Sequence, residues 1–158
     1  MRAMISIRIA TEKDIDAIVR LVNQAFLVEQ FFIKRDRTDS ATVRALMEKG
    51  MFLLAEEDSR PVGCVYAELR IEHGYFGMLS IDPPRQGAGV GRQLVAAVEQ
   101  YFRDAGCGFS DLKIVNVRTE LHEMYHRWGY ADAGTDVYDD PTPTKIPVHF
   151  INMSKPLG

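Results

Sequence analysis

The sequence predicts an α/β (α+β) fold: a mixed sheet of about seven strands flanked by four helices. Three observations support this prediction. Apolar and polar residues alternate in several short runs, which is the period of a strand with one buried face. In four other segments apolar residues recur every three or four positions, the period of an amphipathic helix. Finally, between one such strand and one such helix, glycine occupies every second position from residue 87 to residue 91.

The first third of the chain predicts one strand and two helices. Residues 4–9 alternate between isoleucine and polar side chains, as in a strand. Thr11 and Asp14 have the spacing of a capping box, and apolar residues follow at helical spacing as far as residues 28–30. A second apolar-periodic segment ends at Gly50, a residue that favours helix ends.

The middle of the chain predicts a meander of three antiparallel strands. They cover residues 51–56, 62–70 and 75–81, and polar turns at residues 57–60 and 72–74 connect them. The last of these strands leads directly into the glycine-rich loop.

The C-terminal half then predicts a helix, a strand, a helix and two final strands. Gly106, Gly129 and a proline-rich loop separate them, and no linker divides residues 1–158, which we expect to form a single domain. The complete order is therefore β-α-α-β-β-β-α-β-α-β-β. The last five elements are expected at residues 90–105, 112–115, 121–128, 130–138 and 148–153.

Length, charge and cysteine content narrow the class of protein. A chain of 158 residues with a net charge of -3 has room for one core and lacks the clustered basic excess of nucleic-acid-binding proteins. The N-terminus lacks the apolar core of a signal peptide, and no later run approaches the roughly 18 apolar residues that span a bilayer, so a cytoplasmic protein is expected. Cys64 and Cys107 have no C-x-x-C partner and are expected to be reduced thiols in the core.

The glycine-rich loop, QGAGVGR, is the most informative stretch. A P-loop needs Lys and then Ser or Thr after its last glycine, whereas Arg92 follows Gly91 here. A dinucleotide fingerprint needs G-x-G-x-x-G, and these glycines read G-x-G-x-G. What fits is Q-x-x-G-x-G, beginning at Gln86. Glycines at a helix start let backbone N–H groups approach a phosphate, although an ordinary glycine-rich connection that binds nothing has the same composition.

The loop, the element order and the segment MYHRWGY, in which Tyr125 precedes Gly129 and Tyr130, resemble the GNAT superfamily of N-acetyltransferases along essentially the whole chain. The resemblance implies acetyl-CoA as cosubstrate, with its pyrophosphate on the glycine loop. It also implies that the pantetheine arm lies as a pseudo-strand where the fourth and fifth strands splay apart. The positions implied for cofactor binding are Leu79, Ser80, Ile81, Gln86, Gly87, Ala88, Gly89, Val90, Gly91, Arg92, Asn116 and Arg118.

The resemblance further implies that Tyr125 protonates the departing thiolate, although helical spacing also allows it to be a core residue. The general base is less defined, because residues 75–81 contain no acidic side chain where some family members have a glutamate. Glu68 is the expected catalytic base, and Glu29 and His73 are the alternatives, each acting directly or through water.

One position departs from the family pattern. An asparagine commonly stands seven residues before the tyrosine, but here that position is Arg118, with Asn116 two residues earlier. The resemblance places the acceptor pocket between the loop of the last two strands, residues 138–146, and the region joining the first two helices. Candidate residues in that region are Phe31, Phe32, Lys34, Arg35 and Arg37.

These observations predict an acetyl-CoA-dependent N-acetyltransferase. The expected reaction is direct transfer of an acetyl group, in a ternary complex, to a primary amine of a small molecule or peptide. The last strand, with Val148, Phe150 and Ile151, is compatible with a homodimer and equally with a strand buried within one chain.

Two other functions are left open. His122, Glu123 and His126 form an H-E-x-x-H motif that Asp132 could complete, as in a zinc peptidase. Four arguments oppose a zinc peptidase. The helix is short, no secretory signal is present, Gly129 is already explained as a helix cap, and the glycine loop would have no function. Without zinc, the two histidines are expected to face solvent. The second alternative is an acyl-CoA-binding module of the same fold without catalysis.

Overall fold

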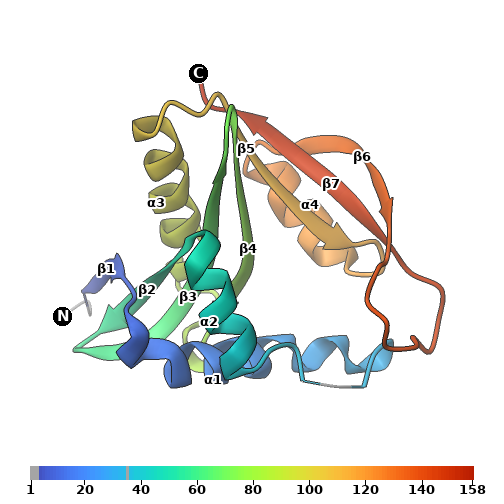
Figure 1. Cartoon of the computed structure of the whole chain (residues 1–158), viewed down its shortest axis with the longest axis horizontal. Helices are drawn as coiled ribbons and strands as arrows, with labels where there is room; N and C mark the ends of the chain where they lie inside the picture. The colour runs from blue at the N-terminus through green and yellow to red at the C-terminus, as the bar shows by residue number, and fades with distance from the viewer. Residues whose placement is uncertain (1–3, 35) are drawn as a thin grey trace.

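The computed structural model describes residues 4–34 and 36–158. Among these residues, seven strands form one mixed sheet in the order β1-β2-β3-β4-β5-β7-β6 (Figure 1). Neighbouring strands run antiparallel except β4 and β5, which are parallel. With four α-helices, this is the α/β fold that the sequence predicts. The elements are β1 (Ile5–Ile9), α1 (Ile15–Ala25), α2 (Ser40–Lys49), β2 (Met51–Glu57), β3 (Arg60–Arg70), β4 (His73–Ile81), α3 (Val90–Asp104), β5 (Phe109–Val115), α4 (Thr119–Arg127), β6 (Ala131–Val137) and β7 (His149–Pro156).

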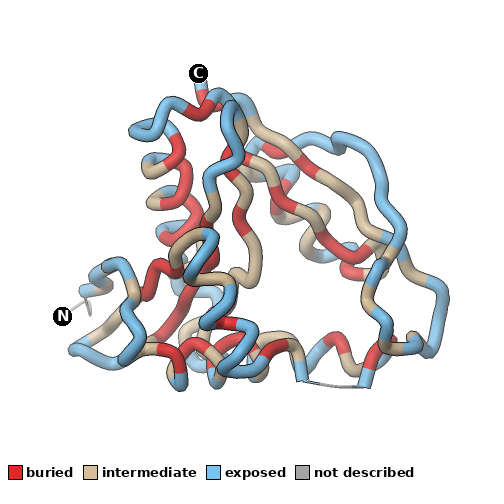
Figure 2. Tube along the Cα trace, in the orientation of Figure 1, coloured by how far each residue is buried: buried red, intermediate tan, exposed pale blue. Residues whose placement is uncertain are grey.

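Helices cover both faces of the sheet, so two apolar layers form. On one face α3 and α4 pack on the sheet, and Phe102 of α3 and Phe76 of β4 both belong to the larger core. On the other face α1 and α2 form the second core, where Leu21 meets Phe52. Figure 2 shows the buried positions concentrated in the central strands and on the sheet-facing sides of the helices, whereas β6 is exposed throughout.

The sheet opens at its centre. The parallel ladder between β4 and β5 covers only His73–Gly74–Tyr75 against Phe109–Ser110–Asp111. Beyond it the two strands diverge in a V (Figure 1), so the second half of β4 has an edge that no described strand of this chain pairs with. This is the splay that the resemblance implies, and it creates space inside the sheet.

An irregularity in β4 lies beside this opening. The register between β3 and β4 shifts between Cys64 and Tyr66, and Met78 has a φ of +54°. Such a β-bulge bends a strand and changes the direction of its backbone groups. Because positive φ is costly for a side chain as large as methionine, the surrounding packing must hold this conformation.

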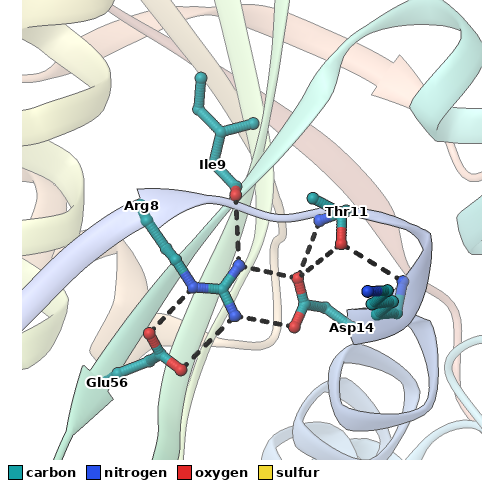
Figure 3. Close-up of polar contacts among 6 residues, drawn as sticks. Arg8, Ile9, Thr11, Asp14 and Glu56 are labelled. Atoms are coloured by element: carbon teal, nitrogen blue, oxygen red, sulfur yellow. Dashed lines mark hydrogen bonds and ion pairs between the residues drawn. The ribbon is translucent and has the colours of Figure 1, made fainter. Parts of the chain in front are cut away.

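A charged network fastens the N-terminal strand to the first helix (Figure 3). The Arg8 guanidinium donates to Glu56 on β2 at 2.9 Å and to both carboxylate oxygens of Asp14 at 2.8 and 2.9 Å. The Asp14 carboxylate in turn accepts from the backbone N–H of Thr11 at 2.8 Å, which completes the capping box that the sequence predicts. The network therefore fixes where α1 leaves the sheet.

The first helix ends earlier than its apolar spacing predicts. The α-helix stops at Ala25, and the chain continues as a 3-10 helix, η2 (Phe26–Phe31). A 3-10 helix has three residues per turn, so the side chains rotate away from the α-helical stripe. Leu27 and Val28 become exposed, while Glu29 turns inward and is buried.

The cysteines and the helix lengths complete the description of the fold. Cys64 and Cys107 are both free and buried, as the sequence predicts. In the described part of the chain, no helix is long and apolar enough to cross a membrane.

Candidate active site

A cavity of about 360 Å³ occupies the opening between β4 and β5. Its walls come from these two strands, from α4, and from the segments that approach from η2 and from the loop before β7. The residues that matter most for its chemistry are Glu29, Tyr75, Leu79, Arg118, Tyr125 and Tyr138. The cavity joins residues from both halves of the chain.

The glycine loop links the end of β4 to α3 through a 3-10 turn, η3 (Pro83–Arg85). Gly87 and Gly89 have φ values of +83° and +85°, and a Cβ at either position would meet no atom within 4 Å. Gly89 is the N-cap of α3, and no side chain caps this helix. The N–H groups of the first turn therefore lack intrahelical partners, and together with the helix dipole they favour an anion in the open space beside the loop.

Side chains around the loop hold it in place. Arg85 donates two hydrogen bonds to Glu57 of β2, at 2.6 and 2.7 Å, and Gln86 donates from Nε2 to the carbonyl of the last β4 residue at 3.3 Å. Arg92, in the first turn of α3, lies with its guanidinium 5.2 Å from the centre of the Trp128 ring. Of the other expected positions, Ala88 is exposed and Val90 is buried in the core, so only backbone groups of Val90 can contact a ligand.

The three strand positions expected to meet the cofactor lie along the open edge of β4. Leu79 lines the cavity. Ser80 is buried and donates from Oγ to the carbonyl of Met78 at 2.9 Å, and Ile81 is half-buried beside Gly91. Within the described residues no ladder joins residues 76–81 to β5, so an extended ligand has a strand edge to bind.

Tyr125 projects from α4 towards the cavity and lines it. Its ring packs edge-on against Phe76, Trp128 and Tyr130, with ring centroids 6.0, 5.6 and 5.9 Å away. Burial raises the pKa of its phenol, so the group stays protonated at neutral pH although burial also makes it a weaker acid. Tyr125 therefore packs in the core and also lines the cavity, so its position suits both the catalytic role that the resemblance implies and the core role that its helical spacing allows.

A buried ion pair stands beside Tyr125 in the wall of the cavity. Glu29 of η2 accepts from Nη1 of Arg118 at 2.8 Å, and each side chain is only about a tenth exposed (11% and 10%). Burial raises the pKa of Glu29, although the Arg118 charge opposes the shift. The sequence identified both residues as candidates, but nothing in their spacing indicated that they pair.

The other candidate bases lie elsewhere. Glu68 does not line the cavity; it accepts from the Tyr66 hydroxyl at 2.7 Å and from Arg70. Although partial burial opposes it, these hydrogen bonds lower the pKa of Glu68. His73 stacks on Phe109 and contacts Asp111 at 2.7 Å, and it does not line the cavity either. Of the three candidates, the structure brings Glu29 to the cavity.

Asn116 and Arg118, the expected contacts at the start of α4, are placed differently from each other. The Asn116 side chain accepts from the backbone N–H of His149 at 2.8 Å and thereby joins β5 to β7. Arg118 is buried in the cavity wall, where it also contacts Glu120. A side-chain contact to a ligand is therefore open to Arg118, whereas the oxygen of Asn116 already serves the fold.

Two segments expected to form the acceptor pocket meet at the far side of the cavity. Phe32 is buried and packs edge-on against Tyr138, and Lys145 of the second segment donates its backbone N–H to the Phe32 carbonyl at 2.7 Å. Arg37 lines the cavity, whereas Phe31 is half-exposed and does not. Lys34 does not line the cavity, and Arg35 lies outside the described residues.

The H-E-x-x-H residues form a separate cluster. The Nε2 atoms of His122 and His126 lie 2.6 and 3.0 Å from Oδ1 of Asp132, the second residue of β6. None of these residues lines the cavity. The histidines therefore share a carboxylate rather than simply facing solvent. Gly129, with a φ of +96°, ends α4 as its sequence position predicts.

Sequence comparison assigns the family. A model of the acetyltransferase (GNAT) family matches residues 15–130, which cover α1 to α4 and the glycine loop between them. The chain belongs to this family. It is also similar to an aminoglycoside N(6')-acetyltransferase type 1 from Stenotrophomonas maltophilia, with 35% identity over 104 residues. That match covers 58% of this chain and 65% of the relative, so it spans less than two thirds of the relative's length.

Solved structures share the fold at low sequence identity. The ribosomal-protein-S18-alanine N-acetyltransferase from Escherichia coli superposes with a TM-score of 0.80 over 98% of this chain and 95% of its own, at 17% identity. The yncA protein from Salmonella typhimurium, solved with its cofactor acetyl-CoA, superposes with a TM-score of 0.76 over 99% and 95%, at 20% identity. These similarities establish the shared fold.

Proposed function

We propose that this chain transfers an acetyl group from acetyl-CoA directly to a primary amine of a small molecule or a peptide. One observation carries the proposal: the cavity between β4 and β5 has Tyr125 in its wall and is lined by Leu79, on the strand that leads into the glycine loop. A long thioester with a charged end and a reactive end requires such an arrangement. The family membership and the relatives named above support it.

The chain's own groups fit the parts of acetyl-CoA. The uncapped first turn of α3 and the open space at Gly87 and Gly89 suit the pyrophosphate, and Arg92 supplies a nearby cation. The unpaired edge at Leu79, Ser80 and Ile81 suits the pantetheine arm, which carries amide groups that can bond as a strand does. A backbone N–H of the same edge would polarise the thioester carbonyl.

The chemical step requires one base and one acid. The base takes a proton from the incoming ammonium, because only the neutral amine has a lone pair for attack. The neutral amine nitrogen then bonds to the acetyl carbon, and the carbon–sulfur bond breaks. The nitrogen gives up its second proton, which replaces the proton that the acid gives to the departing thiolate. We assign the protonation of the departing thiolate to Tyr125, which is protonated and lines the cavity.

For the base we assign Glu29 in place of Glu68. Glu29 lines the cavity, and its raised pKa makes it a better proton acceptor than an ordinary surface carboxylate. Glu68 lies outside the cavity with a lowered pKa, so it is less basic and is further from a bound amine. Glu29 would act through a water molecule, since Arg118 already contacts one of its oxygens.

The lining of the cavity favours a positively charged acceptor. Four carboxylates line it, against three basic side chains, and Tyr138 adds an aromatic ring of the kind that attracts cations, whereas the Tyr75 ring already carries the Arg70 guanidinium at 4.1 Å. These carboxylates are Glu29, Asp36, Asp139 and Asp140. An amino sugar or a peptide with a free amino terminus has this chemistry, and the relative from Stenotrophomonas maltophilia is named for an aminoglycoside.

The proposal is tested by supplying acetyl-CoA with a panel of amino sugars, polyamines and peptides with free amino termini. Release of the CoA thiol must match acceptors that gain the mass of one acetyl group. Direct transfer predicts initial-rate lines that intersect when both substrates are varied, whereas a covalent acetyl-enzyme gives parallel lines. Tight binding of acetyl-CoA without transfer to any acceptor would contradict catalysis and support a binding module instead.

We also propose that two copies associate through the edge strand β6. All seven residues of β6 are exposed, Val137 among them, and the outer side of this strand has no partner among the described residues. β7, with Phe150 and Ile151, is instead paired on both sides within the chain. Size-exclusion chromatography with light scattering measures the mass of the protein in solution and so tests the proposed dimer. A monomeric mass at millimolar protein concentration would contradict it.

A further inference from the structure

A compact trio of metal-ligand side chains lies at the corner where α4 turns into β6. His122 and His126 belong to successive turns of α4, and their ring centroids are 4.5 Å apart. Asp132 faces them from β6, with Oδ1 at 2.6 and 3.0 Å from their Nε2 atoms. One ligand atom from each of the three residues lies within 4.8 Å of the other two.

The three side chains have the ligand types and the spacing that a metal site needs. Imidazoles four residues apart lie on the same side of a helix, and a carboxylate supplies a third ligand of a kind that zinc accepts. Zinc lies about 2.0–2.2 Å from nitrogen and oxygen ligands, so its ligand atoms stand about 3.3–3.6 Å apart in a tetrahedral site. The two nitrogen–oxygen distances, 2.6 and 3.0 Å, need to open by about an ångström or less to admit such an ion between Asp132 and the two imidazoles.

The hydrogen bonds of the metal-free trio already orient its side chains. Each imidazole points its Nε2 atom at the same carboxylate oxygen, so little rotamer freedom has to be lost when an ion replaces the shared protons. All three side chains are partly accessible, with exposures of 31%, 48% and 51%, so an ion can reach them from solvent.

We propose that His122, His126 and Asp132 bind a divalent transition-metal ion of the Zn²⁺ class on the surface of the α4–β6 corner. Three protein ligands leave the fourth position to water. The ion would cross-link α4 to β6 across the turn at Gly129 and so hold in place the helix that carries Tyr125. The proposal does not depend on acetyl transfer, because none of the three ligands lines the cavity.

The site is not assigned as a peptidase centre. The cavity of the described residues lies along a different side of α4, the one that carries Leu121, Met124 and Tyr125. Glu123, the residue that would act as base in a peptidase, is exposed and is not among the clustered ligands. The expected effect of the ion is therefore on the stability of the corner and not on hydrolysis.

The test is a calorimetric titration of the metal-free full chain with Zn²⁺. We expect one ion per chain with a dissociation constant in the micromolar range, and a rise in Tm of roughly 5–10 °C when zinc exceeds that constant about a hundredfold. Asp132→Asn and His126→Ala should each weaken binding at least tenfold. Glu123→Gln, on the same helix, and His149→Ala, on β7, are matched controls that should bind as the wild type does.

Three results would overturn the proposal. They are no saturable binding up to millimolar zinc, unchanged affinity in both ligand variants, or equal weakening in the two controls. Should His126→Ala fail to fold, Asp132→Asn still decides the matter, because this half-exposed residue is replaced by one of the same shape. Cobalt provides a second readout, since its visible spectrum must change with the ligand variants and not with the controls.

Discussion

Nη1 of Arg118 lies 2.8 Å from Oε2 of Glu29, although 89 residues separate them in the chain. This buried pair ties η2 to the start of α4 and forms part of the cavity wall. A buried charge that loses its partner is strongly destabilising, so neither residue can be removed without cost. The pair therefore both stabilises the fold and forms part of the proposed active site.

Replacing Glu29 by Gln removes the proposed base and keeps its shape. We expect kcat to fall about 100-fold, because general-base catalysis typically contributes at least that much. The raised pKa of Glu29 also predicts that the wild-type rate increases with pH as this carboxyl loses its proton, and that the variant lacks this limb of the profile. Steady-state kinetics across a pH series measures both effects.

Glu120→Gln is the matched control, since Glu120 contacts the same Arg118 from the exposed side. This variant should keep its rate and pH profile. A Glu29→Gln enzyme with the wild-type kcat and pH profile would remove Glu29 from the mechanism and reopen the question of Glu68.

Tyr125→Phe removes only the hydroxyl that we assign as general acid. Single-turnover transfer should slow about 100-fold, while the dissociation constant for acetyl-CoA changes little. Tyr130→Phe is the control, because Tyr130 is a buried neighbour whose hydroxyl instead donates to Glu99 at 2.8 Å. It should lower Tm and leave the rate near that of the wild type. If Tyr125→Phe instead lowered Tm and kept the wild-type transfer rate, Tyr125 would be a core residue without a catalytic role.

The network around Arg8 predicts a pH-dependent stability. Hydrogen bonds from Arg8 lower the pKa of Asp14 to about 2, despite the opposing effect of burial. A carboxyl with a lowered pKa stabilises the fold above its unfolded pKa of roughly 3.9, and this stabilisation is lost as the pH falls towards 2. Arg8→Met should therefore lower the free energy of unfolding by about 1 kcal/mol at pH 7, because solvent screens this partly exposed ion pair. Below pH 4 the same substitution should lower it by less.

Urea unfolding at several pH values measures this difference. Arg44→Met is the control, because among the described residues Arg44 makes a single exposed ion pair, to Glu12 at 3.6 Å, and its loss should cost little stability at any pH. A loss in Arg8→Met that stays constant from pH 7 to pH 3 would show that Asp14 does not account for it.

Much of the fold could be predicted from the sequence because its signals are local. Alternation and helical spacing indicated the strands and helices, glycines marked their ends, and the resemblance to the family implied the splayed sheet. The early end of α1 was missed, because Phe26 continues the apolar spacing of the helix whichever helix type follows. The positive φ of Met78 was missed as well, since no residue type in the strand signals a bulge.

The site was predictable only in part, for a related reason. Gly89 and Tyr125 belong to short motifs that can be recognised without knowing the fold. The pairing of Glu29 with Arg118 depends on how distant segments pack, which spacing within one segment does not encode. The approach of Asp132 to the two histidines is the intermediate case, because six residues and one tight turn separate it from His126.

Acetyl-CoA binding by matched glycine variants tests the central claim most directly. Gly89 and Gly106 both have positive φ, at +85° and +87°, and at both positions a Cβ would meet open space. Replacement by alanine therefore strains both backbones alike, by roughly 1 kcal/mol, but only Gly89 belongs to the proposed pyrophosphate site.

Calorimetric titration of the three proteins with acetyl-CoA should give micromolar binding for the wild type and for Gly106→Ala. Binding by Gly89→Ala should be at least tenfold weaker. Equal affinities in folded Gly89→Ala and Gly106→Ala, or no binding by the wild type, would contradict the assignment of the glycine loop and with it the proposed acetyl transfer.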